Sequence, residues 1–467
     1  MTWKIRKGCF VAAILSFAIP MSAGTPLSVA ARKAVESLRS RPASSRGPLD
    51  IVKSLTVEAG PRPAGSAGDR AAVDWALRTM KALGLSNVHA EPVSVPHWVR
   101  GTASAQVVTP FRQVFSAVAL GGSIGTPEEG IEADVVRVDS LEALDRLDKA
   151  DVAGRIVFFD RPMRRTRDGS GYGGAVVVRG SGAIHAARLG AIAVVIRSIS
   201  TSSNRLPHTG AMRYDENVPK IPAAAISNPD ADLLVEELSQ GSPVRLRLTL
   251  TSRSLSPEVS ANVIGEVPGS RSPEEIVLLG AHLDSWDLGT GAQDDGAGCG
   301  IVLEAARRIA ALPVRPGRTV RVVLFANEEF GLSGATAYAE AHASELFRHV
   351  IASESDSGSG CAYRFSTHVA FAALGSFDEM ADLLAPMGIS RGGNDAGGGA
   401  DLGPLGEKGV PVASISQDSS LYFDVHHSAN DTLDKIQPLE LEQVAAAFSI
   451  FAYCAAETSD RFTPVGD

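Results

Sequence analysis

The chain has 467 residues, of which 44% are hydrophobic and 21% are charged, a composition typical of folded globular proteins with more than one domain. Its formal net charge of −9 does not favour binding to nucleic acid or to an anionic membrane surface, so neither partner is expected. After the first 23 residues, the cysteines Cys299, Cys361 and Cys454 are too widely spaced for a disulfide framework, although one disulfide is possible.

Residues 1–23 have the pattern of a secretory signal peptide. Lys4, Arg6 and Lys7 precede an apolar run at 9–21, and small residues follow it. This run is too short to span a bilayer, and no later run reaches the ~18 residues required, so no membrane span is expected. We expect cleavage near Ala23, which removes three positive charges and takes the net charge from −9 to −12. The sequence therefore predicts an exported protein, periplasmic or secreted.

The first half of the chain predicts one domain inserted into another. A turn rich in Pro and Gly begins at residue 59 and leads into a helix that ends near 85. Between 121 and 255, strands are expected at 154–160 and 218–227, and a helix that begins near 182 runs into a strand that ends near 198. We interpret 121–255 as a smaller β/α domain inserted between two parts of a larger domain, 24–120 and 256–467.

The insert contains the segment GSGYGG at 169–174, which has the spacing of a dinucleotide-binding fingerprint. Such a fingerprint should follow a strand directly and open a helix. Here an apolar run follows instead, so we expect a loop rather than a nucleotide site.

The second half of the chain alternates strands and helices. Strands are expected at 275–281, 319–326, 349–353 and 410–416, with helices at 297–312 and 438–457. This order predicts an α/β fold with a mostly parallel (mixed) sheet and helices on both faces.

Histidine and acidic residues gather where these strands end. The groups are His282 with Asp284, Asp294 with Asp295, Glu328 with Glu329, and Asp356, joined by His426 and His427 near the end of the chain. Solvated loops explain one such group but not several, because the carboxyl ends of parallel strands meet at one edge of a sheet. Clustered carboxylates repel one another, and a divalent cation resolves that repulsion. Imidazole and carboxylate ligands without thiolate suit zinc, cobalt or manganese.

The number of acids fits two metal ions. Two metals that share one carboxylate need five protein ligands, and two Zn²⁺ ions with three carboxylates and one hydroxide form a neutral core. One carboxylate then remains to transfer protons, and the adjacent pair Glu328 and Glu329 supplies one ligand and one base. Asp284 lies two residues after His282, where it can hold the second ring nitrogen of that imidazole.

Five short segments carry a family resemblance: HLDS, GAQDDGAG, NEEFGLSGA, ESDSG and HHSANDT. They resemble the metal motifs of the co-catalytic zinc exopeptidases, which include bacterial aminopeptidases and glutamate carboxypeptidases. Segments 91–101, 122–131 and 207–227 resemble the carboxypeptidase Q subgroup, and the insert resembles its protease-associated domain. The resemblance implies a homodimeric, zinc-dependent exopeptidase with two Zn²⁺ ions that hydrolyses short peptides, above all dipeptides with free termini.

The same resemblance assigns roles to individual residues. It implies that His282 and Asp356 bind one zinc, Glu329 and His427 bind the other, Asp294 bridges them, and Glu328 is the general base. The spacing of the motifs selects Asp294 over Asp295 and His427 over His426, although either could be displaced by one residue, and a cis peptide is implied after Asp294.

Alternatives remain open for residues and for function. His208 could bind a substrate carboxylate, Tyr422 could stabilise an oxyanion, and Asp401 could contact a substrate amine, although we do not assign it that role. The enzyme alternatives are a broader aminopeptidase that acts on longer peptides and a single-zinc cyclase. A protein of another class, a non-catalytic receptor on the same scaffold, would show broken ligand motifs, whereas here all are intact.

Overall fold

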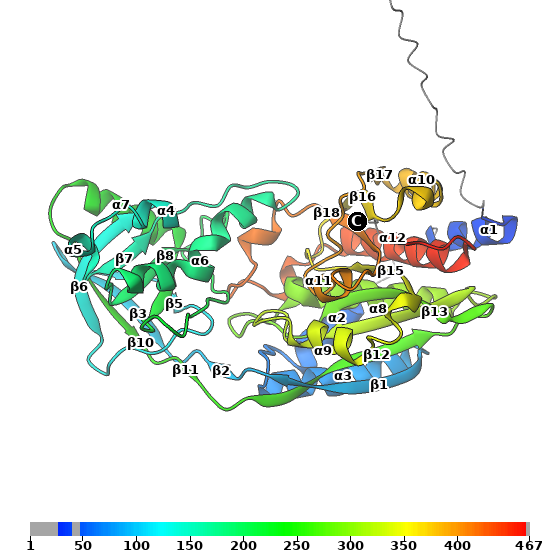
Figure 1. The fold of residues 1–467 in the computed structure, drawn as a ribbon, viewed down its shortest axis with the longest axis horizontal. Coiled ribbons are helices and arrows are strands. Elements are labelled where there is room, and N and C mark those ends of the chain that lie inside the picture. Colours follow the sequence, from blue (N-terminus) through cyan, green and yellow to red (C-terminus); the bar gives the residue numbers. More distant parts are fainter. Residues whose placement is uncertain (1–26, 40–46, 464–467) are drawn as a thin grey trace, which may run out of the picture.

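The structure, a computed structural model, describes residues 27–39 and 47–463. The predicted signal peptide, residues 1–23, lies outside the described residues. Figure 1 shows that the chain forms two lobes side by side, each built around its own sheet.

The larger lobe contains an eight-stranded mixed sheet. In order across the sheet, its strands are β1 (Ser86–Val95), β12 (Glu258–Val267), β14 (Arg318–Phe325), β13 (Ser272–His282), β15 (His349–Glu354), β18 (Val412–Gln417), β16 (Ala362–His368) and β17 (Ser390–Arg391). The strands β14, β13, β15 and β18 are parallel, whereas β1, β12 and β16 pair in antiparallel fashion. These four parallel strands are the four that the sequence predicts, which confirms the α/β fold class.

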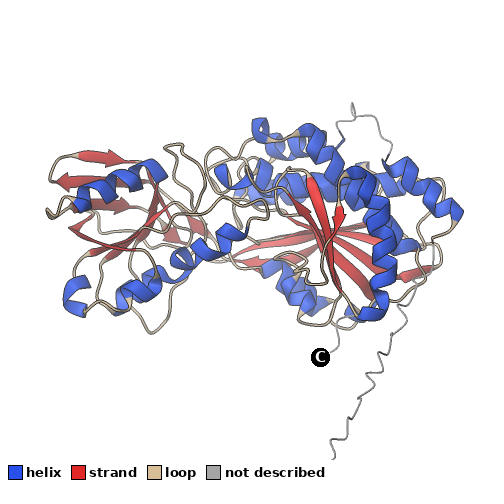
Figure 2. Ribbon diagram, turned by 90° about the horizontal axis from the view of Figure 1, so that it is seen from above, coloured by secondary structure: helices blue, strands red, loops and turns tan. Residues whose placement is uncertain are grey.

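Helices cover both faces of this sheet, as Figure 2 shows. On β13, Val277 and Leu279 face one apolar cluster, and Ile276 and Leu278 face another, because alternate residues of a strand point to opposite sides. One face packs against α1 (Val29–Arg39), α2 (Gly47–Glu58), α3 (Ala67–Ala82), α8 (Ala297–Ala310), α10 (Leu374–Leu384) and α12 (Pro438–Glu457). The other packs against α9 (Ser333–Ala341) and α11 (Gly403–Gly406). Burial on both faces explains why the strands are continuously apolar.

The last helix, α12, is a core helix of the larger lobe. Its length and composition would allow it to cross a membrane, but 83% of its most apolar stretch is buried inside the protein. It packs against α8, α2 and the sheet. The three described cysteines, Cys299, Cys361 and Cys454, are free, so the disulfide left open by the sequence is not formed among them.

The smaller lobe contains a second eight-stranded sheet. In order, its strands are β4 (Gln113–Phe115), β3 (Ala103–Thr109), β10 (Arg245–Leu250), β6 (Ile131–Val138), β7 (Ile156–Phe159), β8 (Ala193–Arg197), β9 (Ala223–Ile226) and β5 (Ala117–Ala119). One face packs against α4 (Leu141–Leu144), α5 (Lys149–Val152) and α6 (Ser170–Arg188), and the other against α7 (Asn228–Ser239). A short antiparallel pair, β2 (Trp98–Val99) with β11 (Arg253–Ser254), lies where the chain passes between the lobes.

Two expectations about the smaller lobe need correction. Its sheet includes β3, β4 and β5, which lie before residue 121, so by sheet membership the lobe begins near residue 103. The pairing of β3 with β10 joins residues about 140 positions apart, which local patterns cannot reveal.

The glycine-rich segment 169–174 opens helix α6 and is not the loop that we predicted. Gly169 has φ 71° at the helix start, a conformation that glycine adopts without penalty. A Cβ on Gly171 would lie 1.9 Å from the Arg164 carbonyl oxygen, so the glycine there permits a close backbone approach.

Candidate metal centre

Three neighbouring parallel strands bring the acidic groups to one edge of the larger sheet. His282 is the last residue of β13, and Asp356 follows β15 after one residue. After β14, Asn327 adopts φ 57°, and this left-handed turn presents Glu328 and Glu329 at the same edge. The strand ends thus converge as the sequence predicts.

Asp294 lies at the centre of the resulting cluster. One oxygen, Oδ1, is 3.1 Å from Nε2 of His282, and the other, Oδ2, is 3.2 Å from Nε2 of His427. Nε2 of His427 is also 2.8 Å from Oε2 of Glu329, and Nε2 of His282 is 3.7 Å from Oδ1 of Asp356. All five residues predicted as metal ligands therefore lie together, with one imidazole on each side of the Asp294 carboxylate.

The neighbouring residue Asp295 has different partners. Its Oδ2 accepts a hydrogen bond from the backbone N–H of His282 at 3.2 Å, and its Oδ1 accepts one from Gly298 at 2.9 Å. Both carboxylate oxygens of Asp295 already accept backbone N–H groups. Asp294 is therefore better placed to bridge two sets of metal ligands. The peptide bond between the two residues is cis, as the family resemblance implies.

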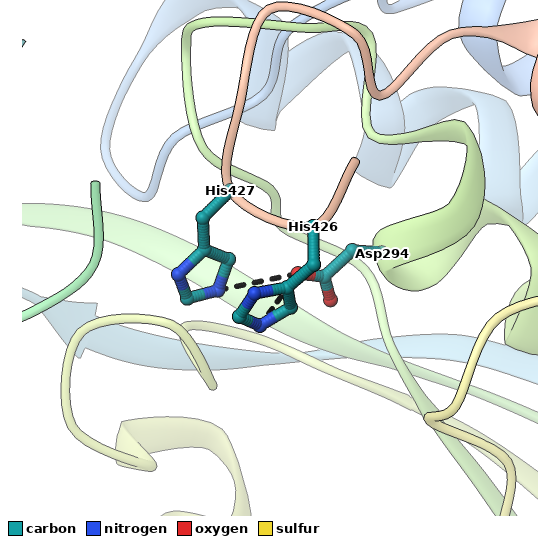
Figure 3. A group of neighbouring side chains, drawn as sticks. All are labelled: Asp294, His426 and His427. Atoms are coloured by element: carbon teal, nitrogen blue, oxygen red, sulfur yellow. Dashed lines mark ion pairs between the residues drawn. The ribbon is translucent and has the colours of Figure 1, made fainter. Parts of the chain in front are cut away.

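His426 and His427 both lie beside Asp294, and Figure 3 shows the two rings next to each other, each joined to its carboxylate by a dashed line. The ring centroids are 3.5 Å apart, and Nε2 of His426 is 3.6 Å from Oδ2 of Asp294. The surroundings of the two rings differ. His427 also forms an ion pair with Glu329, whereas His426 packs among the rings of Tyr172, Tyr422 and Phe423. This geometry favours His427 as the ligand, although Asp294, His426 and His427 together could also hold an ion.

Asp284 supports the cluster from behind. Its Oδ1 accepts a hydrogen bond from the backbone N–H of Glu328 at 3.0 Å, and its Oδ2 accepts one from Glu329 at 3.4 Å. The imidazole of His282 is held by the backbone carbonyl of Asp284, 3.1 Å from Nδ1, while the carboxylate is 3.6 Å away. Because Nδ1 donates to this carbonyl, Nε2 is the ring nitrogen that faces Asp294 and Asp356 and that would bind a metal ion.

Burial and crowding shift the pKa values of the site. Burial, with Asp294 beside it, raises the pKa of Glu329 to about 7, and burial raises the pKa of Glu328 well above its usual range. Burial would lower the pKa values of His282 and His427, but the surrounding carboxylates outweigh it and raise both well above the ordinary value. Without a cation the cluster must therefore retain protons, and a bound divalent ion would take their place.

The residues present fit a divalent metal. Oδ2 of Asp294 and Oε1 of Glu329 are buried without a hydrogen-bond partner, and a bound cation would satisfy both. Three groups of ligand atoms converge within 4.8 Å: Asp294, His426 and His427; His282, Asp295 and Asp356; and His282, Asp294 and Glu329. Imidazole nitrogen and carboxylate oxygen without thiolate are the donor set of catalytic zinc sites.

A cavity of about 300 Å³ lies beside the cluster and is lined by residues of both lobes. The larger lobe contributes Glu328, Asp356 and Tyr422, and helix α6 of the smaller lobe contributes Tyr172 and Arg179. Our sequence analysis did not single out Tyr172 or Arg179. The available signal was a lone arginine within the small apolar run from 175 to 183, where a charged side chain needs a specific partner.

The smaller lobe also holds the loop that carries the histidines. The N–H of Thr209 donates to the carbonyl of His427 at 2.9 Å, and the carbonyl of Thr209 lies 3.3 Å from Nδ1 of His427. Nδ1 of His208 lies 2.6 Å from the carbonyl of His426, and burial lowers the pKa of His208 to about 4. His208 therefore braces the histidine loop and is absent from the cavity wall.

Tyr422 and Asp401, the two other residues considered from the sequence, occupy different positions relative to the cavity. Tyr422 lines the cavity, and burial, followed by the charge of Asp294, raises the pKa of its hydroxyl well above the usual value. Asp401 is fully buried beneath the cluster, and neither of its carboxylate oxygens has a hydrogen-bond partner. Burial raises the pKa of Asp401 well above its usual value.

A mixed α/β sheet whose carboxyl edge gathers imidazoles, carboxylates and a cavity defines a metallohydrolase. Residues 262–452 match the model of Peptidase family M28. Carboxypeptidase Q from Bos taurus is 37% identical over 86% of this chain and 83% of its own length. The chain therefore belongs to peptidase family M28, which confirms the exopeptidase class predicted from the sequence.

Two further relatives extend this comparison. The crystal structure of a Peptidase M28 precursor from Shewanella amazonensis SB2B has a TM-score of 0.92 and 48% sequence identity, and the match covers 94% of this chain and 99% of that one. Aminopeptidase YwaD from Bacillus subtilis (strain 168) is 26% identical, covering 70% of this chain and 64% of its own length. The relatives thus include both a carboxypeptidase and an aminopeptidase by name.

Proposed function

We propose that the protein is a dizinc exopeptidase that hydrolyses short peptides, above all dipeptides with free termini. The observation that carries this proposal is that Glu328 and four of the five ligand-type side chains line one small cavity, while the fifth, His282, lies 3.1 Å from Asp294. A cavity of about 300 Å³ is at the lower end of the range for small-molecule sites, which suits a substrate of a few residues. The similarity to carboxypeptidase Q supports the same class of reaction.

In this proposal the ligands divide on either side of Asp294. His282 and Asp356 bind one ion, Glu329 and His427 bind the other, and each oxygen of Asp294 faces one imidazole. Bound divalent ions supply a Lewis acid for the peptide carbonyl and lower the pKa of water from roughly 15.7 to about 7. The Asp284 carboxylate accepts the backbone N–H groups of Glu328 and Glu329 and holds these two residues in their separate orientations.

Glu328 is the proton carrier. It lines the cavity, and burial raises its pKa well above the usual range, which makes it a stronger base than an exposed carboxylate. The carboxylate removes a proton from the water whose oxygen forms the new C–O bond. It then delivers that proton to the amine nitrogen as the C–N bond breaks.

The test is Glu328→Gln, which keeps the shape of the side chain and removes its basicity. We expect zinc content and folding to remain and turnover of an unblocked dipeptide to fall by about 10²- to 10⁴-fold. Glu340→Gln is the matched control, since Glu340 is exposed on α9 and lies outside the cavity. Unchanged turnover in Glu328→Gln would contradict the assignment.

The second candidate is a broader aminopeptidase, which the similarity to aminopeptidase YwaD favours. The two functions can be distinguished by the substrates that the enzyme cleaves. An aminopeptidase cleaves amino-acyl anilides and longer peptides, whereas a dipeptidase requires a free carboxylate one residue after the scissile bond. Comparable kcat/KM values for an anilide and a dipeptide would support the aminopeptidase.

The remaining proposals concern the whole protein. We propose that the smaller lobe is a protease-associated-type domain, that residues 1–23 direct export, and that the enzyme is a homodimer. Mass spectrometry of the exported protein would locate the first residue, and analytical ultracentrifugation would give the oligomeric state. An intact N-terminus or a monomer at all concentrations would contradict the respective proposal.

A further inference from the structure

The two histidines predicted as metal ligands are held by different lobes. Nδ1 of His282 lies 3.1 Å from the carbonyl of Asp284, two residues later in the larger lobe. Nδ1 of His427 lies 3.3 Å from the carbonyl of Thr209, which precedes β9 in the smaller lobe. The outer partner of a metal-binding histidine fixes which ring nitrogen carries the hydrogen and how the ring is oriented. The smaller lobe therefore supplies this partner for His427 and not for His282.

The backbone of His427 also depends on Thr209. His427 has φ 59°, in the left-handed region that residues other than glycine rarely adopt. The N–H of Thr209 donates to the carbonyl of His427 at 2.9 Å. Arg179 also lies near the ring, with Nη1 3.5 Å from Nδ1 of His427, but a guanidinium has no acceptor, so the carbonyl of Thr209 is the acceptor for Nδ1. One residue of the smaller lobe thus holds both the main chain and the ring of His427.

Other contacts join the loop that carries His427 to the smaller lobe. They include hydrogen bonds to backbone carbonyls and an ion pair, at distances from 2.6 to 2.8 Å: Ser200 with Phe423, His208 with His426, and Arg165 with Asp424. The chain itself crosses between the lobes at the paired strands β2 and β11. The position of the loop relative to the smaller lobe therefore depends on these non-covalent contacts.

Arg100 links Thr209 to the larger lobe. It follows β2, where the chain passes between the lobes, and it is buried. Its Nη1 donates to the hydroxyl of Thr209 at 2.8 Å and to the carbonyl of Ala119, and its Nε donates to Oδ1 of Asp287 at 2.8 Å. Asp287 belongs to the loop that follows β13 in the larger lobe. Because a buried charge must be paired, the ion pair with Asp287 gives Arg100, and through it Thr209, a defined position.

The packing around Arg100 is close. The guanidinium carbon lies 4.9 Å from the ring centroid of Trp98 and 5.3 Å from that of Trp286. The ring of Trp286, in the larger lobe, is also 5.8 Å from the ring of His427. A Cβ on Gly121, in the smaller lobe, would lie 2.0 Å from the ring of Trp286, so the glycine permits this approach. The two lobes are thus in tight contact at the point where Arg100 joins them.

We infer that Thr209, fixed by Arg100, is a positioning residue for the ion on the His427 side of the metal centre. The smaller lobe completes this ion site, whereas the larger lobe alone forms the site on the His282 side of Asp294. This inference rests on the proposed dizinc function. It extends that function, because the affinity for one of the two ions then depends on how the lobes pack together.

The test measures zinc affinity in Thr209→Val, which removes the hydroxyl that contacts Arg100 and Ala119. Competition with a chromophoric chelator gives a dissociation constant for each of the two zinc ions. We expect one constant to rise by about 10-fold, the lower end of the effect of losing an outer partner of a metal ligand, and the other to stay within about 2-fold of its native value. Thr209→Ser keeps the hydroxyl and should bind both ions as the native protein does.

Thr319→Val is the matched control. Thr319 is also buried, and its hydroxyl also accepts one hydrogen bond, from Gly269 at 3.0 Å, and donates another, to Pro273 at 2.8 Å. It lies at the start of β14, at the opposite end of that strand from the metal centre. Thr319→Val should lower the melting temperature and leave both zinc affinities at their native values.

Asp287→Asn tests the link from the larger lobe. The side chain of Asp287 is 33% exposed, so this variant decides the question if Thr209→Val does not fold. Because Asp287 reaches Thr209 through Arg100, we expect the affinity for one ion to fall by at least about 3-fold and the other to remain native. Native affinities for both ions in the folded variants, or equal losses at both, would overturn the inference.

The His427→Ala background identifies the ion that is affected. Once the ring that Thr209 holds is gone, adding Thr209→Val should change the affinity of the remaining zinc ion by less than about 2-fold. A larger loss would show that Thr209 acts on the other ion, and the inference would be wrong. A native protein that binds fewer than two zinc ions would instead refute the proposed function.

Discussion

Asp284 joins the end of strand β13 to the segment that follows strand β14 at the metal site. Its two carboxylate oxygens accept the backbone N–H groups of Glu328 and Glu329, and its carbonyl holds His282. Asp284→Asn keeps the shape of the side chain but replaces one accepting oxygen with an NH₂ group. One of the two backbone N–H groups then faces a donor inside the protein, and the negative charge behind the site is lost.

The magnitude follows from these contacts. A buried N–H group left without its acceptor costs about 1–3 kcal/mol, and loss of an outer partner of a metal ligand lowers metal affinity by about 10- to 100-fold. The two estimates agree, because 10- to 100-fold corresponds to about 1.4–2.8 kcal/mol. We therefore expect Asp284→Asn to bind the weaker zinc ion 10- to 100-fold less tightly than the native protein.

Competition with a chromophoric zinc chelator measures this affinity directly. Asp230→Asn is the matched control, because Asp230 is buried in the smaller lobe and accepts hydrogen bonds from Ser116 and Ser227 away from the cavity. Asp230→Asn should lower thermal stability and leave zinc affinity at the native value. Native zinc affinity in Asp284→Asn would refute the role that we give to this carboxylate.

Three further predictions follow from the site and the core. Burial raises the pKa of Glu329 to about 7 and that of Glu354 to about 8. In the metal-free protein the folded state is therefore favoured over the unfolded state while these two carboxyl groups are protonated, and it loses stability as pH rises through these values. Its melting temperature should fall between about pH 5 and pH 8, with zinc restoring it most at the upper end, and a flat profile in melting experiments would contradict the shifts. His427→Ala should lose at least one zinc equivalent by elemental analysis, whereas His426→Ala should keep both, and equal losses would reject the assignment of His427. Phe451→Ala, in the core of α12, should lower the free energy of unfolding by about 3–5 kcal/mol in urea titrations, and a loss below about 1 kcal/mol would show that the helix is not packed as described.

The elements of the larger lobe were predictable because each carries a local signal. The helix expected at 438–457 matches α12 (Pro438–Glu457) at both ends, since Pro438 fits a first helical turn and a buried stripe follows. The four predicted strands match β13, β14, β15 and β18 because burial on both faces makes their sequences continuously apolar. Parallel strands then place His282, the Glu328–Glu329 pair and Asp356 at one edge by topology alone.

Features set by long-range packing could not be read from local patterns. The start of the smaller lobe depends on the pairing of β3 with β10, and two glycines of α6, Gly171 and Gly182, permit close approaches to Arg164 and Phe159. Arg179 was missed for the same reason, since its place in the cavity depends on how the two lobes meet. The choice of Asp294 over Asp295 came from the family resemblance, and the structure adds the physical reason that Asp295 already accepts two backbone N–H groups.

The central claim is that two divalent ions occupy the carboxyl edge of the larger sheet, on either side of Asp294. Inductively coupled plasma mass spectrometry on protein dialysed against zinc and then against metal-free buffer tests it most directly. We predict two zinc ions per chain, falling to one or none in Asp294→Ala. A native protein that retains no zinc while remaining folded would contradict the account.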